Sequence, residues 1–210
     1  MSEPQTARSF PALILAGGLS RRMGRDKTVV GLAGKPMIAH VIDRLRPQVS
    51  NLAVNAPPSV LPEIGFPVLP DTVPGHAGPL AGVLAGLIHA RESMPEASHL
   101  LTVPADTPFL PLDLTAKMTA NIEPRRIVVA TSLGRIHPVV ALWPISLADD
   151  LEEWLGDPDN RKLQSFIAHY PSKTVDFLPV ETASGPLDPF FNVNTPDDLA
   201  RAEQILKERP

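Results

Sequence analysis

The chain has 210 residues, of which 43% are hydrophobic and 20% are charged, and its formal net charge is −4 at pH 7. These values are typical of a globular protein, and the acidic balance argues against a general nucleic-acid binder, which needs a basic face. The sequence contains no cysteine, which excludes disulfides, thiolate metal sites and a cysteine nucleophile and fits a reducing cytoplasm.

The N-terminal segment leads into an apolar run. Residues 1–10 are polar and are expected to be flexible. Residues 12–16 are apolar and predict a buried parallel strand. Gly17-Gly18 interrupts the run and no convincing cleavage pattern follows, so it is not an export signal. No run approaches the ~20 apolar residues of a membrane span, so no membrane partner is expected, and residues 11–210 are predicted to form one domain.

A basic, glycine-rich loop follows this strand. It carries four Lys or Arg side chains within seven residues, namely Arg21, Arg22, Arg25 and Lys27. Glycines let the backbone approach a ligand closely, so that successive N–H groups can converge on an anion while the cations neutralise its charge. Ligands of open α/β sheets bind at the carboxyl ends of the strands. The loop therefore predicts a triphosphate-binding site, with an ordinary turn carrying solvated charges as the alternative.

The spacing of this loop excludes two familiar phosphate-binding motifs. Gly18 and Gly24 are too far apart for a Walker loop, and the adjacent Gly17 and Gly18 do not fit the dinucleotide fingerprint. Residues 15–27 instead follow the pattern L-A-G-G-x-x-x-R-M-G-x-D-K. This pattern resembles the signature loop of nucleotidyltransferases that activate sugars and pterins, and most closely that of the molybdenum cofactor guanylyltransferase family.

The remaining chain alternates short apolar runs with helical patterns. Strands are predicted over 52–55, 66–69, 100–103, 127–131, 138–143 and 174–177. Helices are predicted over 37–46, 79–90, 111–121, 146–155 and 162–169, and from Pro196 after a Thr195 cap. Such alternation indicates a three-layer α/β/α, Rossmann-like fold with a mainly parallel central sheet, as the nucleotidyltransferase resemblance also implies.

Asp106 follows the strand predicted over 100–103, between two prolines. A carboxylate at a strand end suits Mg²⁺, which prefers few protein oxygens together with phosphate and water. The alternative is a turn or helix-capping aspartate before Pro111. The resemblance implies that Asp106 binds both the metal and the nucleotide.

Residues 78–82, G-P-L-A-G, open the predicted helix and leave backbone amides at its positive end. Close helix packing explains the same small residues equally well. The resemblance implies that this segment lines the guanine pocket. The positions that match nucleotide-binding residues of the family are Leu15, Ala16, Gly17, Gly18, Lys27, Asn55, Asp71, Gly78 and Asp106.

Three further elements match the family. Asn192 and Asn194 resemble its N-x-N-T-P element, which faces the metal and the reacting phosphates. Arg161 and Lys162 resemble a basic pair that meets the pterin, although a solvated charged loop is nearly as good an interpretation. His137 precedes a proline and a predicted strand, and a packing or hydrogen-bonding role is favoured for it.

The resemblance implies transfer of GMP from GTP to the terminal phosphate of molybdopterin, with Mg²⁺ as cofactor and pyrophosphate as the released product. Arg22, Lys27 and Asp106 would carry catalysis. The attacking phosphomonoester has a second pKa of about 6, so it is largely ionised at pH 7 and needs no general base. Transient contact with other cofactor-biosynthesis proteins or acceptor molybdoenzymes would follow from this role.

Other nucleotidyltransferases form the main alternative. Cytidylyl-transferring relatives tend to have L-A-A-G and lack the aspartate before the lysine, so Gly18 and Asp26 favour guanylyl transfer. A sugar-phosphate acceptor also stays open. A non-catalytic nucleotide-binding regulator would not need Asp106, Lys27 and the asparagine pair together.

Overall fold

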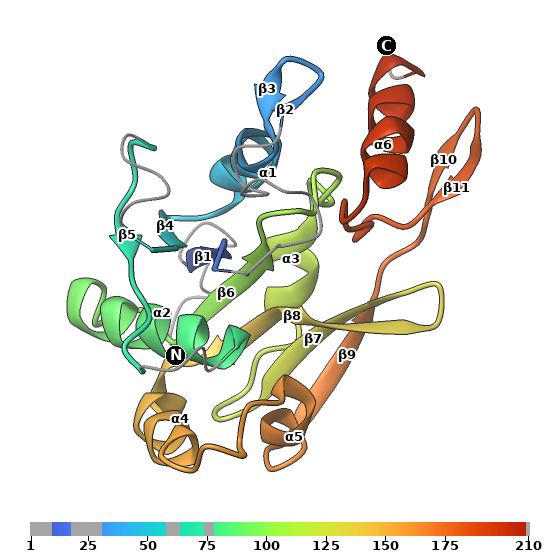
Figure 1. The fold of residues 1–210 in the computed structure, drawn as a ribbon. Helices are drawn as coiled ribbons and strands as arrows, with labels where there is room; N and C mark the ends of the chain where they lie inside the picture. Colours follow the sequence, from blue (N-terminus) through green and yellow to red (C-terminus); the bar gives the residue numbers. More distant parts are fainter. Residues whose placement is uncertain (1–9, 18–30, 58–63, 74–77, 209–210) are drawn as a thin grey trace.

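The computed structural model describes residues 10–17, 31–57, 64–73 and 78–208, and its centre is a seven-stranded sheet of order β5-β4-β1-β6-β8-β7-β9 (Figure 1). The strands are β1 Pro11–Leu15, β4 Asn51–Asn55, β5 Val68–Leu69, β6 His99–Pro104, β7 Ile127–Ser132, β8 Arg135–Pro144 and β9 Ser172–Asp176. Only β8 runs antiparallel to its neighbours β6 and β7, and every other pair in this sheet is parallel. The predicted mainly parallel sheet is confirmed.

The antiparallel direction of β8 comes from a tight hairpin. Ser132 pairs with Arg135, which leaves a two-residue turn of Leu133 and Gly134 with φ of 48° and 72°. Positive φ at both central residues is typical of a type I′ turn, whose twist matches that of the flanking strands. A two-residue loop can join only antiparallel strands, so β8 enters the parallel sheet reversed.

Helices cover both faces of this sheet. They are α1 Met37–Leu45, α2 Pro79–Ser93, α3 Leu114–Thr119, α4 Ala148–Leu155, α5 Leu163–Ile167 and α6 Pro196–Glu208, with short 3-10 helices η4 Arg46–Gln48 and η5 Ile145–Leu147. One apolar core unites α1 and α3 with Ala12 and Ile14 of β1, and a second unites α2, α4 and α5 with Leu13. Alternate residues of a strand point to opposite faces, so β1 supports both cores and the three-layer prediction is confirmed. Within the described segments, no helix is long and apolar enough to cross a membrane.

A third, smaller core lies beside the main sheet. It joins Leu32 of the β2 (Gly31–Leu32) and β3 (Lys35–Pro36) hairpin and Leu187 of the β10 (Val180–Thr182) and β11 (Gly185–Leu187) hairpin to Ala202 and Ile205 of α6. The sequence did not predict the β10–β11 hairpin. It did predict the start of α6, which a capping box fixes: the Thr195 Oγ1 accepts from the Asp198 N–H at 3.1 Å, and an Asp198 carboxylate oxygen accepts from the Thr195 N–H at 2.9 Å.

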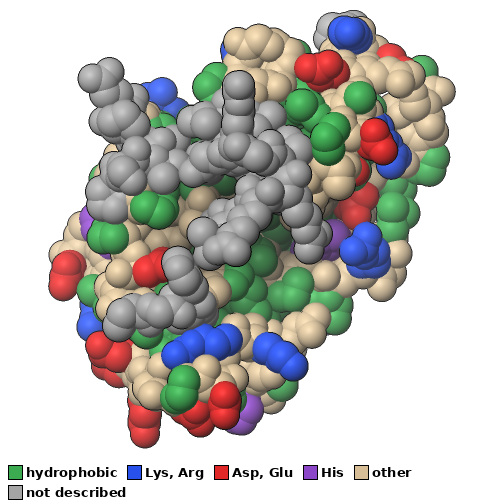
Figure 2. Space-filling view, viewed as in Figure 1, with side chains coloured by type: hydrophobic (Ala, Val, Ile, Leu, Met, Phe, Trp, Pro, Cys, Tyr) green, Lys and Arg blue, Asp and Glu red, His purple; other side chains and the backbone are tan. Residues whose placement is uncertain are grey.

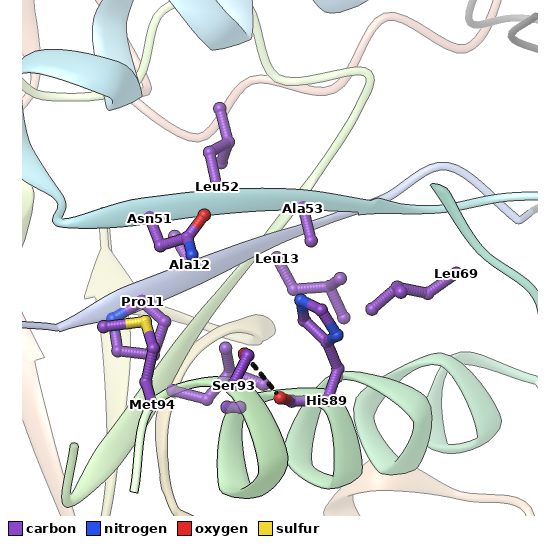
Figure 3. Close-up of a pocket in the computed structure, with 13 residues that line it drawn as sticks. Pro11, Ala12, Leu13, Asn51, Leu52, Ala53, Leu69, His89, Ser93 and Met94 are labelled. Carbon is purple, nitrogen blue, oxygen red and sulfur yellow. Dashed lines mark hydrogen bonds between the residues drawn. The ribbon is translucent and has the colours of Figure 1, made fainter. Parts of the chain in front are cut away.

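α2 packs unusually close to the sheet. Figure 3 shows Leu13 of β1 and Ala53 of β4 on the side of these strands that faces α2. A β-carbon built on Gly86 would lie 2.6 Å from Leu13 Cδ2 and 2.8 Å from Leu100 Cδ2, so any larger residue would force these buried leucines to shift. The prediction that small residues let this helix pack closely on the sheet is confirmed.

Gly86→Ala should therefore lower the free energy of unfolding by about 1 to 2 kcal/mol, because overpacking of the buried leucines outweighs the roughly 1 kcal/mol by which alanine favours a helix. Urea denaturation measures the change. Gly31→Ala is the matched control, because nothing lies within 4 Å of a β-carbon there, and it should change stability by about 0.5 kcal/mol or less. Equal stabilities for the two variants would contradict the close packing.

Candidate functional site

Backbone hydrogen bonds continue past the ends of the parallel strands. The Ala16 N–H donates to the Asn55 carbonyl at 2.8 Å, and the Ala105 N–H donates to the Leu15 carbonyl at 3.1 Å. The segments that follow β1, β4 and β6 are thus held side by side at one edge of the sheet. This is the edge at which open α/β sheets bind ligands.

The described part of the glycine-rich loop ends at Gly17. Leu15 is half-buried, Ala16 is buried and Gly17 is exposed. Gly18, Arg22, Asp26 and Lys27 lie outside the described residues. Their assignments to phosphate binding, catalysis and guanine preference stay predictions.

Asn55 connects four segments at this edge. Its side chain is 3% exposed, and its Nδ2 donates to the Leu69 carbonyl at 3.0 Å and to Asp71 Oδ1 at 2.9 Å. Its Oδ1 faces glycines, since β-carbons built on Gly17 and Gly82 would lie 3.2 Å and 2.3 Å from it. Asn55 therefore positions the exposed Asp71 relative to β1 and α2, and the structure brings these predicted nucleotide-binding residues together.

Gly78 begins α2 in a conformation that favours glycine, with φ of 69° and ψ of −164°. A β-carbon there would lie 3.6 Å from the backbone carbonyl of Arg161. The Arg161 Nη1 donates to the carbonyls of Leu155 and Asp157, both at 3.0 Å, and so satisfies the end of α4. Arg161 thus has a structural task next to Gly78, while contact of Arg161 and the exposed Lys162 with the acceptor stays a prediction.

The structure also brings Asp106 and the asparagine segment together. The Val193 N–H donates to the Asp106 carbonyl at 2.9 Å, which ties the segment between Asn192 and Asn194 to the turn after β6. Among the described residues, no group of three or more His, Asp or Glu side chains could hold a metal ion. One carboxylate with neighbouring amide oxygens fits Mg²⁺ that takes its other ligands from water and substrate phosphates.

A buried polar network lies next to this segment. The Ser132 hydroxyl donates to Asp188 Oδ1 at 2.6 Å and contacts His137 Nε2 at 2.8 Å, and the Phe190 N–H donates to the same carboxylate oxygen at 2.8 Å. His137 Nε2 also lies 3.6 Å from Asp188 Oδ2. Burial lowers the pKa of His137, Asp188 opposes this shift and Arg135 adds to it. The predicted hydrogen-bonding role of His137 is confirmed, whereas Ser132 and Asp188 carry no signal that sequence reasoning could have used.

Beyond the asparagines lies a groove between the β7–β8 hairpin, the β10–β11 hairpin and α6. Its lining residues are Leu133, Arg135, His137, Pro186, Asp188, Phe190, Phe191, Asn192, Asn194, Asp198 and Arg201. Figure 2 shows acidic, basic and histidine side chains together on the side of the molecule where α6 and the hairpins lie. The sequence analysis did not single out Arg135 or Arg201.

Comparison with known families and proteins gives consistent matches. The model of the MobA-like NTP transferase domain matches residues 12–174. The molybdenum cofactor guanylyltransferase of Rhizobium meliloti is 51% identical over 206 residues, which cover 97% of this chain and 94% of that protein. The protein of the same name from Rhizobium rhizogenes is 49% identical over 198 residues, covering 93% of this chain and 92% of that protein.

Solved structures share the fold. Molybdopterin-guanine dinucleotide biosynthesis protein A from Archaeoglobus fulgidus superposes with a TM-score of 0.73 at 22% identity, covering 95% of this chain and all of that one. A 4-diphosphocytidyl-2C-methyl-D-erythritol synthase from Anaerococcus prevotii superposes with a TM-score of 0.67 at 13% identity, covering 96% of this chain and 97% of that one. At these identities the likeness shows the fold alone.

The lowered pKa of His137 makes stability depend on pH. Because burial disfavours the imidazolium form, the unfolded chain binds this proton more readily than the folded chain. The free energy of unfolding should therefore decrease as the pH falls below about 6.5, the ordinary histidine value. His137→Gln should reduce this decrease, and urea denaturation between pH 7.5 and 5 measures it.

The control is His169→Gln, at an exposed histidine that does not line this groove. This variant should keep the pH dependence of the unaltered protein. Stability that falls with pH equally in all three proteins would show that His137 does not contribute to the effect.

Proposed function

The chain belongs to the MobA-like NTP transferase family as a molybdenum cofactor guanylyltransferase, and from this premise we propose how its residues perform the reaction. The enzyme forms molybdopterin guanine dinucleotide from GTP and Mo-molybdopterin. The observation that carries this assignment is the 51% sequence identity to a molybdenum cofactor guanylyltransferase over 97% of the chain. A single domain over residues 11–210, a cytoplasmic location and transient contact with other cofactor-biosynthesis proteins or acceptor molybdoenzymes are included in the proposal.

GTP is assigned to the edge formed by Gly17, Asn55, Asp71 and Gly78. The start of α2 is the positive end of the helix, which favours an electron-rich ligand. Guanine presents adjacent N–H donors, and a carboxylate such as Asp71 can accept both of them. Arg22 and Lys27, which lie outside the described residues, supply the positive charge for the triphosphate in this proposal.

The acceptor phosphate is assigned to the position between this edge and Asp106. Because the phosphomonoester is largely ionised at pH 7, no side chain has to remove a proton before it attacks the α-phosphate of GTP. Attack forms the new P–O bond and breaks the bond to the β-phosphate, so pyrophosphate leaves. Catalysis then rests on positioning and on stabilisation of developing negative charge.

Asp106, with amide oxygens of Asn192 and Asn194, is proposed to hold Mg²⁺. When bound, the ion would neutralise phosphate charge. The hydrogen bond from the Val193 N–H to the Asp106 carbonyl fixes the backbone of these residues relative to one another. This supports a common task for the three side chains.

Nucleotide preference tests the assignment of Asp71. With Mg²⁺ present, GTP should raise the melting temperature more than CTP, UTP or ATP at equal concentration. A ligand stabilises the native state by about 2.7 kcal/mol at one hundred times its Kd, so the nucleotide with the lowest Kd gives the largest increase. Asp71→Asn keeps an oxygen for Asn55 but cannot accept both guanine donors, so it should weaken GTP binding about tenfold. Binding of inorganic triphosphate to this variant should not change. A preference for CTP in the unaltered protein would instead indicate cytidylyl transfer.

Asp106→Asn tests the proposed metal site. The substitution retains the backbone carbonyl that binds Val193, so the fold should persist while Mg²⁺-dependent pyrophosphate release falls by about 100-fold or more. Asp113→Asn is the matched control, because it removes an exposed carboxylate paired with Lys117 and should keep normal turnover. Near-normal turnover of Asp106→Asn would show that Asp106 is only a turn residue.

A further inference from the structure

The groove beyond the asparagine segment has no part in the assignments above, except through Asn192 and Asn194. Its walls come from β8, β11 and α6, on the side of β6 away from β4, which carries Asn55, and β5, which precedes Asp71. One end of the groove is tied to Asp106 through Val193. A molecule whose phosphate lies at Asp106 could therefore extend its other end into this groove.

Each of the groove's two carboxylates accepts hydrogen bonds from within the protein. Asp188 accepts from Ser132 and from the Phe190 N–H, at 2.6 Å and 2.8 Å. Asp198 accepts from the N–H groups of Asn194 and Thr195, at 3.0 Å and 2.9 Å. In each carboxylate these bonds go to a single oxygen, so they use part of its capacity to accept hydrogen bonds.

The groove also contains two guanidinium groups, those of Arg135 and Arg201. Within the described part of the chain, neither Arg135 nor Arg201 forms an ion pair, whereas arginines elsewhere such as Arg91 and Arg125 do. Guanidinium groups present planar sets of donors that suit oxyanions and carbonyl or ring-nitrogen acceptors. The donors that the groove offers to a ligand are thus mainly cationic.

Aromatic rings line the groove, and one of them contacts Arg201. The Arg201 Cζ lies 5.1 Å from the centroid of the half-buried Phe191 ring, at a distance typical of a cation–π contact. The His137 ring lies 4.8 Å from the Phe190 ring centroid and lines the same groove. The half-buried rings of Phe191 and His137 offer flat surfaces for a heteroaromatic ligand, whereas Phe190 is buried beneath His137.

We propose that this groove binds the end of the acceptor that carries the pterin ring and its anionic dithiolene, and that Arg135 and Arg201 are its specificity-determining contacts. The inference rests on the proposed function, because it requires the acceptor phosphate to lie at Asp106. A phosphorylated pterin offers ring nitrogens and a carbonyl as acceptors, and the dithiolene adds negative charge. Two guanidinium groups and flat aromatic surfaces match this chemistry.

The test is acceptor kinetics and GTP calorimetry on Arg135→Ala, Arg201→Ala and the double variant. Charge-assisted hydrogen bonds of this kind predict that each single variant raises the KM for Mo-molybdopterin about tenfold, with a larger increase in the double variant. The kcat should stay within about twofold, because these contacts exist equally in ground and transition states. The Kd for GTP should not change.

Two further variants sharpen the result. Lys207→Ala removes an exposed cation from the same helix, outside the groove, and should leave the acceptor KM unchanged. Arg201→Lys keeps the charge but not the planar donor set, so it should have an intermediate KM. Should Arg201→Ala fail to fold, Arg201→Lys together with Arg135→Ala still tests the proposal.

An unchanged acceptor KM in the double variant, in protein that releases pyrophosphate normally, would overturn this inference and leave the proposed function intact. A raised KM in Lys162→Ala alone would also overturn it, because the acceptor would then extend toward α5. Failure of the unaltered protein to release pyrophosphate from GTP and Mo-molybdopterin would instead contradict the proposed function, and this inference with it.

Discussion

The site depends first on the contact between the Asn55 side chain and the start of α2. Asn55 is buried at the end of β4, and its amide group binds the Leu69 carbonyl and Asp71. Gly82 lies so close that any β-carbon there would collide with the Asn55 oxygen. Loss of the Leu69 or Asp71 acceptor would leave a buried donor of Asn55 unsatisfied, at a cost of about 1 to 3 kcal/mol. Asn55 therefore places Asp71 close to Gly17 and Gly82.

The other half of the site is positioned by different interactions. The hydrogen bond between Val193 and Asp106 ties the asparagine segment to the end of β6, while Asp188 fixes the backbone just before it through Phe190. The Ser132 hydroxyl connects this carboxylate to His137 on β8. The antiparallel entry of β8 into the sheet brings His137 near Ser132, since His137 pairs with Ala130 and Ser132 pairs with Arg135 across the hairpin.

Charge is distributed so that an acidic protein can bind anions. The net charge is −4, yet Asp188 and Asp198 are engaged in internal hydrogen bonds at the groove. Asp150 likewise binds Arg125 and Tyr170 away from the site, and hydrogen bonds from these two groups lower its pKa. Local concentration of available cations matters more for anion binding than net charge does. The reaction also needs no general base, which agrees with a site built mainly from positioning contacts.

The sequence alone determined the elements whose signals are local. The apolar run of β1, the small residues of α2, the cap at Thr195 and the place of Asp106 after β6 could all be predicted, because each depends on neighbours a few positions away.

Only the tertiary structure decided the reversed direction of β8, the β10–β11 hairpin and the structural use of Arg161. It also decided which polar groups remain available to a ligand. Ser132 and Asp188 are separated by 56 positions, and no local pattern predicts that one satisfies the other. Arg135 and Arg201 stand out only when their groove is closed by hairpins and a helix from distant parts of the chain, because burial and pairing of charges are properties of the folded molecule.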